Sequence, residues 1–453
     1  MINNLIKYFQ GKKIIILGFG KEGQSTYNLI RKYLPEQHLY ISDRKENFQK
    51  NFDYLKNDSY LTFISGENYL DNLDSYDIIM KSPGISFAYL DTTKYLSKIK
   101  SQLELLLEFF DNFTIGITGT KGKSTTSSLI YKILKDQKVQ SVFLGNIGVP
   151  VFDYLDNIKQ DEIIVLEMSS HQLEYMNYSP NIAILLNIYE EHLDHYESYL
   201  KYAEAKCNIY KYQNNNDYFL YNIDNEMINK LVKNTNGITY KVSFEGRSNS
   251  NIYIEEGKIL FNGKEVYDIN DRRNLIGDYN LNNIMFALGV SEILDLDLNK
   301  TVKSINEFKT LEHRLEFVGK YDDVLYYDNS IGTVPIATIE AVKALKSVDT
   351  LIIGGMDRGI DYKDFVEFLK NSKIGNIICM PRTGHDIARK LKERNCYIVD
   401  TMEEAVITAK KVTKKGKICL LSPAAASYGF FKNFEERGNL YKKLIQNKDI
   451  DSN

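Results

Sequence analysis

One glycine-rich turn constrains the fold of this chain more than any other stretch. Residues 118–125 read TGTKGKST and lie between an apolar run at 113–117 and a helical pattern of apolar residues at 127–134. The predicted order is therefore a strand, a tight turn and a helix. Such a turn directs several backbone N–H groups and a helix N-terminus toward one point, which suits a polyphosphate. Lys123 would contact the terminal phosphates, and the Ser124 hydroxyl would be a ligand for Mg²⁺.

The match to the usual phosphate-loop pattern is incomplete. That pattern has a glycine five residues before Gly122, where this chain has Ile117. A glycine-containing turn without a ligand is therefore the alternative interpretation. The Gly-Lys-Ser-Thr run that begins at Gly122, placed between a strand and an amphipathic helix, favours nucleotide binding instead. The predicted ATP contacts of this loop are Gly119, Thr120, Lys121, Gly122, Lys123, Ser124 and Thr125.

The composition is typical of a globular protein without a nucleic-acid or membrane partner. The 453 residues suggest about three domains, the net charge is −3, and no dense basic cluster is present. The start of the chain lacks the apolar core of a signal peptide, and no run approaches the roughly 18 apolar residues of a membrane span. The four cysteines contain no Cys-x-x-Cys pair, which favours reduced thiols. These features predict a cytoplasmic protein.

A second glycine turn follows the first predicted strand of the chain. Gly18, Gly20 and Gly23 form a Gly-x-Gly-x-x-Gly motif, and the helix after it is expected to begin near the residue that follows, Gln24. About 20 residues further on, Asp43 ends a second strand, where an acidic group could meet a ribose. The motif alone suggests NAD, but the same geometry serves any nucleotide diphosphate.

A third turn, at residues 82–84, follows another apolar strand of the first segment. In a parallel sheet this turn would lie at the carboxyl edge, where open α/β sheets bind ligands. The first hundred residues are therefore predicted to form a small Rossmann-like domain that binds a nucleotide-like group.

Polar residues end three apolar runs of the central segment. These residues are Asn146, Glu167 and His192. Glu167 lies on a strand that neighbours the phosphate loop, where a carboxylate could hold Mg²⁺ directly or through water. Around His192, two histidines and three acids fall within six residues and could bind a metal. Further on, Tyr202 and Lys206 are one helical turn apart on a shared face. Taken alone, Lys206 is an ordinary solvated lysine.

Five motifs, in this order, resemble those of the Mur ligases. They are GTKGKST at 119–125, GNIG at 145–148, LEMSS at 166–170, EHLD at 191–194 and YAEAK at 202–206. The resemblance extends over essentially the whole chain, from SPGI at 82–85 to LSPA at 421–424. It is closest to the type that adds D-glutamate to UDP-N-acetylmuramoyl-L-alanine. It implies small-molecule substrates (this sugar-peptide, glutamate and ATP), Mg²⁺ at two sites, and a monomer.

The resemblance also implies the substrate and metal contacts. The implied contacts to the uridine diphosphate substrate are Gly18, Phe19, Gly20, Asp43, Arg44, Ser82, Pro83, Gly84, Asn146, Ser169 and Gln172. Lys206 is implied to be carbamylated, which replaces an ammonium with a carboxylate. It could then join Glu167 and His192 at Mg²⁺, because hard cations take oxygen ligands and repel ammonium groups. The implied metal ligands are Ser124, Glu167, His192 and Lys206, and the implied catalytic residues are Lys123, Glu167, His192 and Lys206.

Three further nucleotide contacts are implied by the resemblance. Asn280 and Asn283 match the family element Gly-x-His-Asn-x-x-Asn, just before an apolar helix, although Tyr279 replaces the histidine. Arg314 lies in EHRLE at 312–316, which resembles the family's His-Arg-x-Glu signature. In the family this arginine reaches the nucleotide phosphates from the third domain.

The last segment alternates strands and helices, which predicts a second doubly wound sheet. It departs from the family at one loop. Where the family usually has Asp-Ser-Lys-Ala-Thr-Asn, this chain has Asn329 in place of the aspartate and Ile331 in place of the lysine, with Asp328 adjacent. The implied contacts to glutamate are Thr333, Arg358, Ser427 and Phe434. Arg358 occupies a position where the D-glutamate enzymes often have a lysine, and either cation could bind a carboxylate.

The sequence therefore predicts an α/β protein with three domains. They are a UDP-binding Rossmann-like domain at 1–100, a P-loop ATPase-like domain with a mainly parallel sheet at 101–311, and a Rossmann-like glutamate-binding domain at 312–453. The predicted activity is ATP-dependent addition of D-glutamate through an acyl phosphate, in peptidoglycan precursor synthesis. The alternatives are a Mur or folylpolyglutamate-type ligase with another acceptor, including L-glutamate, a dinucleotide-dependent oxidoreductase, and a regulatory ATP-binding module.

Overall fold

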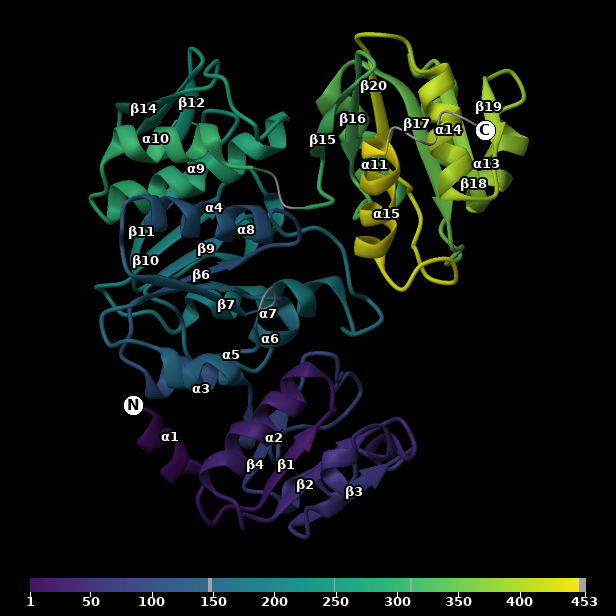
Figure 1. The fold of residues 1–453 in the computed structure, drawn as a ribbon. Helices are drawn as coiled ribbons and strands as arrows, with labels where there is room; N and C mark the ends of the chain where they lie inside the picture. The colour runs from purple at the N-terminus through teal and green to yellow at the C-terminus, as the bar shows by residue number, and fades with distance from the viewer. Residues whose placement is uncertain (146–148, 248, 310–311, 448–453) are drawn as a thin grey trace. The chain divides into compact units, whose positions relative to one another are not determined.

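The computed structural model describes residues 1–145, 149–247, 249–309 and 312–447 (Figure 1). The chain divides into two compact units. The first contains Met1–Arg272 and Leu281–Asn306, and the second contains Arg273–Asn280 and the chain from Glu307 onward. Parallel-dominated sheets with helices between the strands confirm the predicted α/β class. None of the described helices combines the length and apolar character that crossing a membrane requires.

The first sheet has five parallel strands in the order β3-β2-β1-β4-β5. The strands are β1 Ile14–Leu17, β2 Leu39–Asp43, β3 Leu61–Ser65, β4 Ile78–Lys81 and β5 Ile99–Lys100. The helices are α1 Ile2–Phe9, α2 Lys21–Tyr33, and the short η1 Phe48–Asn51, η2 Asp53–Asn57, η3 Leu73–Ser75 and η4 Leu96–Lys98. All four residues of β1 are buried aliphatic residues, as expected at the centre of a parallel sheet.

Helix α2 begins at Lys21, so the predicted start near Gln24 was wrong. Gly20 caps the helix, and Gly18 has a φ of 81°, which favours glycine. A Cβ on Gly23 would collide with the carbonyl oxygen of Gly18. The glycines therefore make a shorter turn than predicted, and the helix N-terminus lies directly after β1.

The second sheet has nine strands in the order β14-β13-β12-β11-β10-β9-β6-β8-β7. Strands from β7 to β12 along this order are parallel, and β13 and β14 extend the sheet in antiparallel fashion. The strands are β6 Thr114–Thr118, β7 Ser141–Gly145, β8 Ile163–Glu167, β9 Ile182–Leu185, β10 Tyr218–Asn222, β11 Ile238–Ser243, β12 Ile252–Glu255, β13 Lys258–Phe261 and β14 Lys264–Asp268. Because β6 lies between β8 and β9, the carboxyl ends of these three strands meet at one edge.

The helices around the second sheet include the one that follows the phosphate loop. They are α3 Gln102–Phe109, α4 Lys123–Asp136, α5 Val151–Tyr154, η5 Leu155–Asn157, α6 Ser170–Leu173, α7 Tyr199–Lys211, α8 Glu226–Leu231, α9 Asp278–Ile293 and α10 Leu298–Glu307. Asn280 and Asn283 lie inside α9, so the prediction that they precede the helix was wrong.

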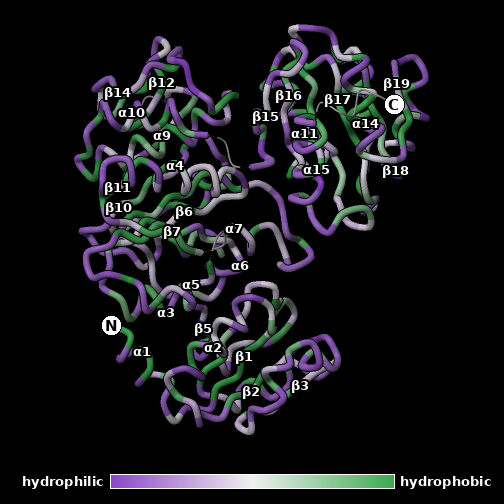
Figure 2. Tube along the Cα trace, in the orientation of Figure 1, coloured by the Kyte–Doolittle hydropathy of each residue, from purple (hydrophilic) through white to green (hydrophobic). Residues whose placement is uncertain are grey.

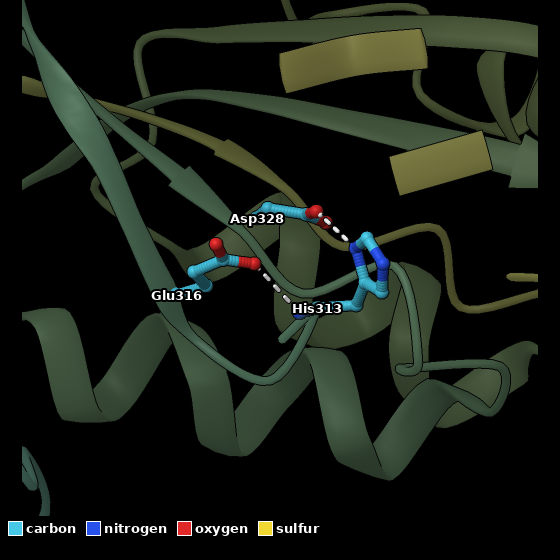
Figure 3. Close-up of side chains that lie close together, drawn as sticks. All are labelled: His313, Glu316 and Asp328. Atoms are coloured by element: carbon cyan, nitrogen blue, oxygen red, sulfur yellow. Dashed lines mark hydrogen bonds and ion pairs between the residues drawn. The ribbon is translucent and has the colours of Figure 1, made fainter. Parts of the chain in front are cut away.

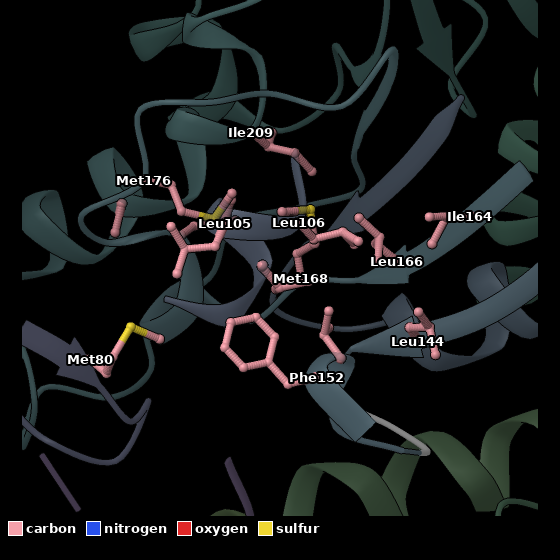
Figure 4. Close-up of a cluster of buried hydrophobic side chains, with 14 of the residues drawn as sticks. Met80, Leu105, Leu106, Leu144, Phe152, Ile164, Leu166, Met168, Met176 and Ile209 are labelled. Carbon is pink, nitrogen blue, oxygen red and sulfur yellow. The ribbon is translucent and has the colours of Figure 1, made fainter. Parts of the chain in front are cut away.

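One apolar core joins the two sheets of the first unit. It contains Met80 from β4, Leu105 and Leu106 from α3, and Leu144 and Leu166 from β7 and β8 (Figure 4). Figure 2 shows the same distribution along the chain, with hydrophobic residues concentrated in strands such as β1 and hydrophilic residues in the outer loops. The buried residues of the first sheet and of the second therefore belong to one continuous apolar cluster.

The third sheet lies in the second unit and has the order β15-β16-β20-β17-β18-β19. Only the β15–β16 pair is antiparallel among the described strand pairs of this sheet. The strands are β15 Glu316–Tyr321, β16 Val324–Asp328, β17 Val348–Gly355, β18 Asn376–Arg382, β19 Cys396–Ile398 and β20 Ile418–Leu421. The helices are α11 Pro335–Leu345, α12 Lys363–Asn371, α13 Thr383–Lys390, α14 Met402–Val412 and α15 Phe434–Gln446. The domain boundaries at 100 and 311 stay a prediction, and residue 311 lies outside the described residues.

Candidate active site

The phosphate loop joins β6 to α4 and is held in place by Asn187, which follows β9. The backbone N–H groups of Thr120 and Lys121 donate to the Asn187 backbone and side-chain oxygens, at 2.9 and 2.8 Å. The Asn187 amide donates back to the Lys121 carbonyl at 3.0 Å. The sequence analysis gave Asn187 no role. A polar residue at the carboxyl end of the strand next to β6 was the signal that could have identified it.

Gly122 and Asn283 fit together at the start of α4. Gly122 has a φ of 90°, and a Cβ on it would lie 2.5 Å from Asn283 Oδ1. Thr126 Oγ1 donates to the same oxygen at 3.1 Å. Asn283 therefore lies at the phosphate loop, and its contact with ATP stays a prediction. Asn280 belongs to the other compact unit, where its Nδ2 donates to the Ile276 carbonyl at 2.7 Å.

Two lysines of this site share one carbonyl oxygen. The Nζ atoms of Lys123 and Lys206 donate to the Gly119 oxygen at 2.8 and 3.0 Å. The Lys206 side chain is buried, with 1% of its surface exposed, and its Nζ lies 4.8 Å from the centre of the Tyr202 ring. Burial lowers the pKa of Lys206 well below its ordinary value, and the Lys123 charge lowers it further. This environment favours the neutral amine of Lys206.

Glu167 and His192 lie at the same edge of the sheet. Glu167 is buried at the end of β8, opposite Ile117 in the neighbouring strand β6. Partial burial lowers the pKa of His192, Glu191 raises it, and the charges of Lys206 and Lys123 lower it. His192 therefore lies within the electrostatic field of Lys123 and Lys206. Lys121, by contrast, forms an ion pair with Glu191.

The oxygen atoms at this edge fit a divalent cation. They come from the Glu167 carboxylate, from Ser124 in the first turn of α4, and from Thr118. Thr118 Oγ1 is buried and has no hydrogen-bond partner within the described part of the chain. The Lys206 amine does not fit a cation, but its carbamate would, because Mg²⁺ prefers oxygen ligands. A carbamate on Lys206 would therefore add an oxygen ligand to this donor set.

The predicted UDP-binding turns converge at the carboxyl edge of the first sheet. Ser82 Oγ donates to the Gly18 carbonyl at 2.9 Å, so the two turns touch. The Phe19 N–H donates to Asp43 Oδ2 at 2.9 Å, which brings the acidic residue to the glycine turn. The Phe19 ring is buried in an aromatic cluster, so its backbone is the part that faces the turn.

The remaining predicted UDP contacts have mixed surroundings. Ser169 and Gln172 form the capping box of α6, which is a structural role. Gln172 Nε2 also donates to Glu22 in the first turn of α2 at 2.8 Å, so it reaches the glycine turn. Arg44 is exposed. Asn146 lies outside the described residues.

A cluster that the sequence analysis did not identify lies in the second unit. Among the described residues, the potential ligand atoms of His313, Glu316 and Asp328 all lie within 4.8 Å of one another (Figure 3). The His313 Nδ1–Asp328 Oδ2 distance is 2.7 Å. Glu316 accepts from the His313 backbone N–H at 2.8 Å and pairs with Lys442 at 3.1 Å. Hydrogen bonds and an ion pair therefore account for the cluster without a metal.

Where the chain departs from the family pattern, Asp328 and Asn329 both have partners within the second unit. Asp328 is fully buried and contacts His313, the residue that precedes Arg314 in the sequence. Asn329 instead joins backbone and side-chain groups: its Oδ1 accepts from the Leu315 N–H at 3.2 Å, and its Nδ2 donates to Ser422 Oγ at 2.9 Å. The adjacent aspartate thus has a buried partner, and the asparagine cross-links the loop.

The predicted glutamate contacts are only partly brought together. Arg437 is buried and donates to Ser330 Oγ at 3.0 Å, and Ser330 Oγ donates to the Phe434 carbonyl at 2.8 Å. Phe434 is thereby tied to the loop that continues to Thr333. Ser427 is buried, whereas Arg358 is exposed.

Gly438 of α15 lies against the His313–Asp328 pair, and a Cβ on it would collide with both side chains. Alanine ordinarily stabilises a helix interior by about 1 kcal/mol relative to glycine. We nevertheless expect Gly438→Ala to lower the free energy of unfolding by about 1–3 kcal/mol, because both neighbours are buried and overpacking dominates. Urea unfolding measures the change. Asn439→Ala, at the next and exposed position, is the control, and a stabilised Gly438→Ala would contradict the prediction.

Comparison with known proteins identifies the family. Residues 117–291 match the model of the Mur ligase middle domain. The UDP-N-acetylmuramoylalanine–D-glutamate ligase of Clostridioides difficile strain 630 is 33% identical over 450 residues, which cover 97% of this chain and 99% of that protein. The enzyme of the same name from Clostridium botulinum strain 657 is 32% identical and covers 98% of this chain and 97% of its own. The chain belongs to the Mur ligase family.

Solved Mur ligase structures share its fold. The MurF ligase of Thermotoga maritima in complex with ADP has a TM-score of 0.59 at 19% identity, with 97% of this chain and 96% of that one covered. A MurF structure from Acinetobacter baumannii has a TM-score of 0.61 at 14% identity and covers 96% and 93%. At these identities the likeness shows the fold alone. It supports the predicted Mur ligase architecture.

His171, in α6 of this Mur ligase, predicts a dependence of stability on pH. Burial lowers its pKa from 6.5 to about 3, and the charges of His195 and His192 act in the same direction. The unfolded chain therefore binds a proton below about pH 6.5 that the folded chain does not, so this residue reduces stability as the pH falls. We expect His171→Phe to lose less thermal stability than the unaltered protein between about pH 7.5 and pH 5. The exposed-site control His38→Phe should not differ from the unaltered protein, and equal slopes for all three would refute the prediction.

Proposed function

We propose that this chain is an ATP-dependent ligase that joins D-glutamate to UDP-N-acetylmuramoyl-L-alanine, a step in peptidoglycan precursor synthesis. The observation that carries the proposal is the near full-length match to relatives with that name, at 33% identity over 97% of this chain. The phosphate loop, with Lys123 and the ends of the neighbouring strands β8 and β9 beside it, would supply the local chemistry that such a ligase needs.

The reaction requires activation of a carboxylate. The substrate carboxylate attacks the γ-phosphorus of ATP, an O–P bond forms, and the bond to the bridging oxygen breaks to release ADP. The amine of glutamate then attacks the acyl phosphate carbon, an N–C bond forms, phosphate leaves, and the nitrogen loses a proton. The first step brings two anions together, so Lys123 and the backbone N–H groups of the loop would act by positioning and neutralising the phosphates. If His192 does not hold Mg²⁺, its neutral ring, favoured by a lowered pKa, would instead accept the amine proton.

Ser124, Glu167, His192 and carbamylated Lys206 are the residues that would hold Mg²⁺, at two sites. Magnesium, when bound, neutralises phosphoryl oxygens during transfer. The surroundings of Lys206 support the modification, in which a neutral amine would attack CO₂, an N–C bond would form and one proton would be released. The resulting carbamate is an anion next to Lys123, whose positive charge would attract it.

Each part of the chain has a proposed substrate. Residues 1–100 would bind the uridine diphosphate group, residues 101–311 ATP, and residues 312–453 glutamate, with Arg314 contacting the nucleotide phosphates. Convergence of Gly18, Ser82 and Asp43 at one sheet edge supports the first assignment. A monomeric, cytoplasmic protein remains our expectation from the sequence.

The decisive test is a coupled phosphate-release assay with purified protein. Phosphate should appear only when ATP, UDP-N-acetylmuramoyl-L-alanine and D-glutamate are all present, and L-glutamate and a panel of other amino acids should not replace D-glutamate. Release with another amino acid would identify a ligase with a different acceptor. No ATP consumption with any acceptor would overturn the proposal, and NADH binding measured by fluorescence would then favour an oxidoreductase.

A further inference from the structure

A buried lysine lies directly before the predicted UDP-binding turn. Lys81 ends β4, immediately before Ser82, and 3% of its side chain is exposed. Its Nζ lies 3.3 Å from Glu174 Oε2 and faces the rings of Phe87 and Tyr175, with centroid distances of 5.7 and 5.4 Å. Removing one member of a buried ion pair leaves an uncompensated charge, so Lys81 and Glu174 depend on each other.

The same glutamate contacts the loop that carries His192. Glu174 Oε2 lies 3.1 Å from His195 Nε2. His195 is in turn part of a tight turn, because its backbone N–H donates to the His192 carbonyl at 3.0 Å. A second link between the two segments is independent of the charges: Ser86 Oγ donates to the His195 carbonyl at 2.7 Å. Glu174 therefore joins the end of β4 to the turn that positions His192.

We propose that Glu174 is a positioning residue for the ligase reaction. By holding Lys81 and His195 together, it keeps the turn that binds the UDP-sugar in register with the loop that carries His192. The reacting carboxylate belongs to the same substrate as the diphosphate, so a shift between turn and loop would misplace it. Small misplacements of this kind reduce rates strongly even when every reacting group is present. This inference rests on the proposed function.

The test is a kinetic comparison of Glu174→Gln with the unaltered full-length protein. The substitution keeps the shape of the side chain and removes its charge. We expect the KM for UDP-N-acetylmuramoyl-L-alanine to rise and kcat to fall, each by about tenfold, while the KM for D-glutamate changes by less than about twofold. A merely structural role would not separate the substrates in this way. Glu36→Gln is the control, because Glu36 is an exposed glutamate of the same compact unit, in the connection between α2 and β2.

A second variant keeps the test decisive if Glu174→Gln folds poorly. Lys81→Met with Glu174→Gln removes both buried charges, so thermal stability should return while the KM for the UDP-sugar stays raised. The inference would be overturned if the double variant recovered the KM of the unaltered protein for the UDP-sugar. It would also be overturned if the losses were equal for all substrates, or if Glu174→Gln folded and had normal kinetics. The unaltered protein distinguishes a failure of the inference from a failure of the proposed function. If the unaltered protein consumed no ATP, the proposed function would be wrong, whatever the role of Glu174.

Discussion

Lys123→Ala is expected to lower kcat/KM for phosphate release by about a thousandfold, the range found when one group that stabilises transition-state charge is removed. The reason is the position of this lysine in the loop between β6 and α4, with its Nζ at the Gly119 and Thr120 carbonyls. In the reaction its charge would be directed to the terminal phosphates, where two anions meet. Phosphate release at saturating D-glutamate and UDP-sugar measures the effect.

Two further variants define what the loss at Lys123 means. Lys135→Ala removes the same charge from an exposed position in the last turn of α4 and should retain full activity. Lys123→Arg keeps the charge but replaces a compact ammonium with a larger planar group, and we expect little recovery in so enclosed a loop. Activity within about tenfold of normal in Lys123→Ala would exclude the role proposed for this loop.

The sequence predicted best where a local pattern determines the structure. The TGTKGKST run at 118–125 gave the turn between β6 and α4, because a strand pattern, two glycines and a helix pattern follow one another within a short stretch. The carboxyl ends of β8 and β9 could be placed beside it, since parallel strands bring these ends to one edge. Helix boundaries were less secure: α2 begins at Lys21 because Gly20 can cap it, and capping depends on backbone angles that periodicity does not specify.

Contacts between distant residues could not be predicted in the same way. Asn187 holds the phosphate loop, and Glu174 pairs with Lys81, which is 93 positions away. Asn329 replaces the aspartate of the family pattern, and the sequence could not show that the adjacent Asp328 has a buried partner in His313. Such pairs depend on how sheets pack, and that packing is set by the whole core and not by one segment.

Lys206→Ala is expected to abolish ligase activity almost completely and to regain part of it with formate or acetate. Burial and the charge of Lys123 lower the pKa of the Lys206 amine, which favours the neutral form that reacts with CO₂. The carbamate would supply an oxygen ligand for Mg²⁺, and a small carboxylate could occupy the space left by the alanine. Phosphate release with and without added carboxylate measures both parts of the prediction.

A readout that does not depend on activity tests the modification itself. Protein equilibrated with ¹³C-labelled bicarbonate should show a carbamate carbon resonance that is absent in Lys206→Ala. Lys201→Ala is the matched control, because Lys201 is an exposed lysine on the same helix, α7, and its removal should affect neither the resonance nor the activity. A labelled signal that persists in Lys206→Ala would place the carbamate elsewhere. If the resonance is absent and small carboxylates do not rescue Lys206→Ala, Lys206 is an unmodified buried amine. Glu167, His192 and Ser124 would then have to bind Mg²⁺ without Lys206, beside the charge of Lys123.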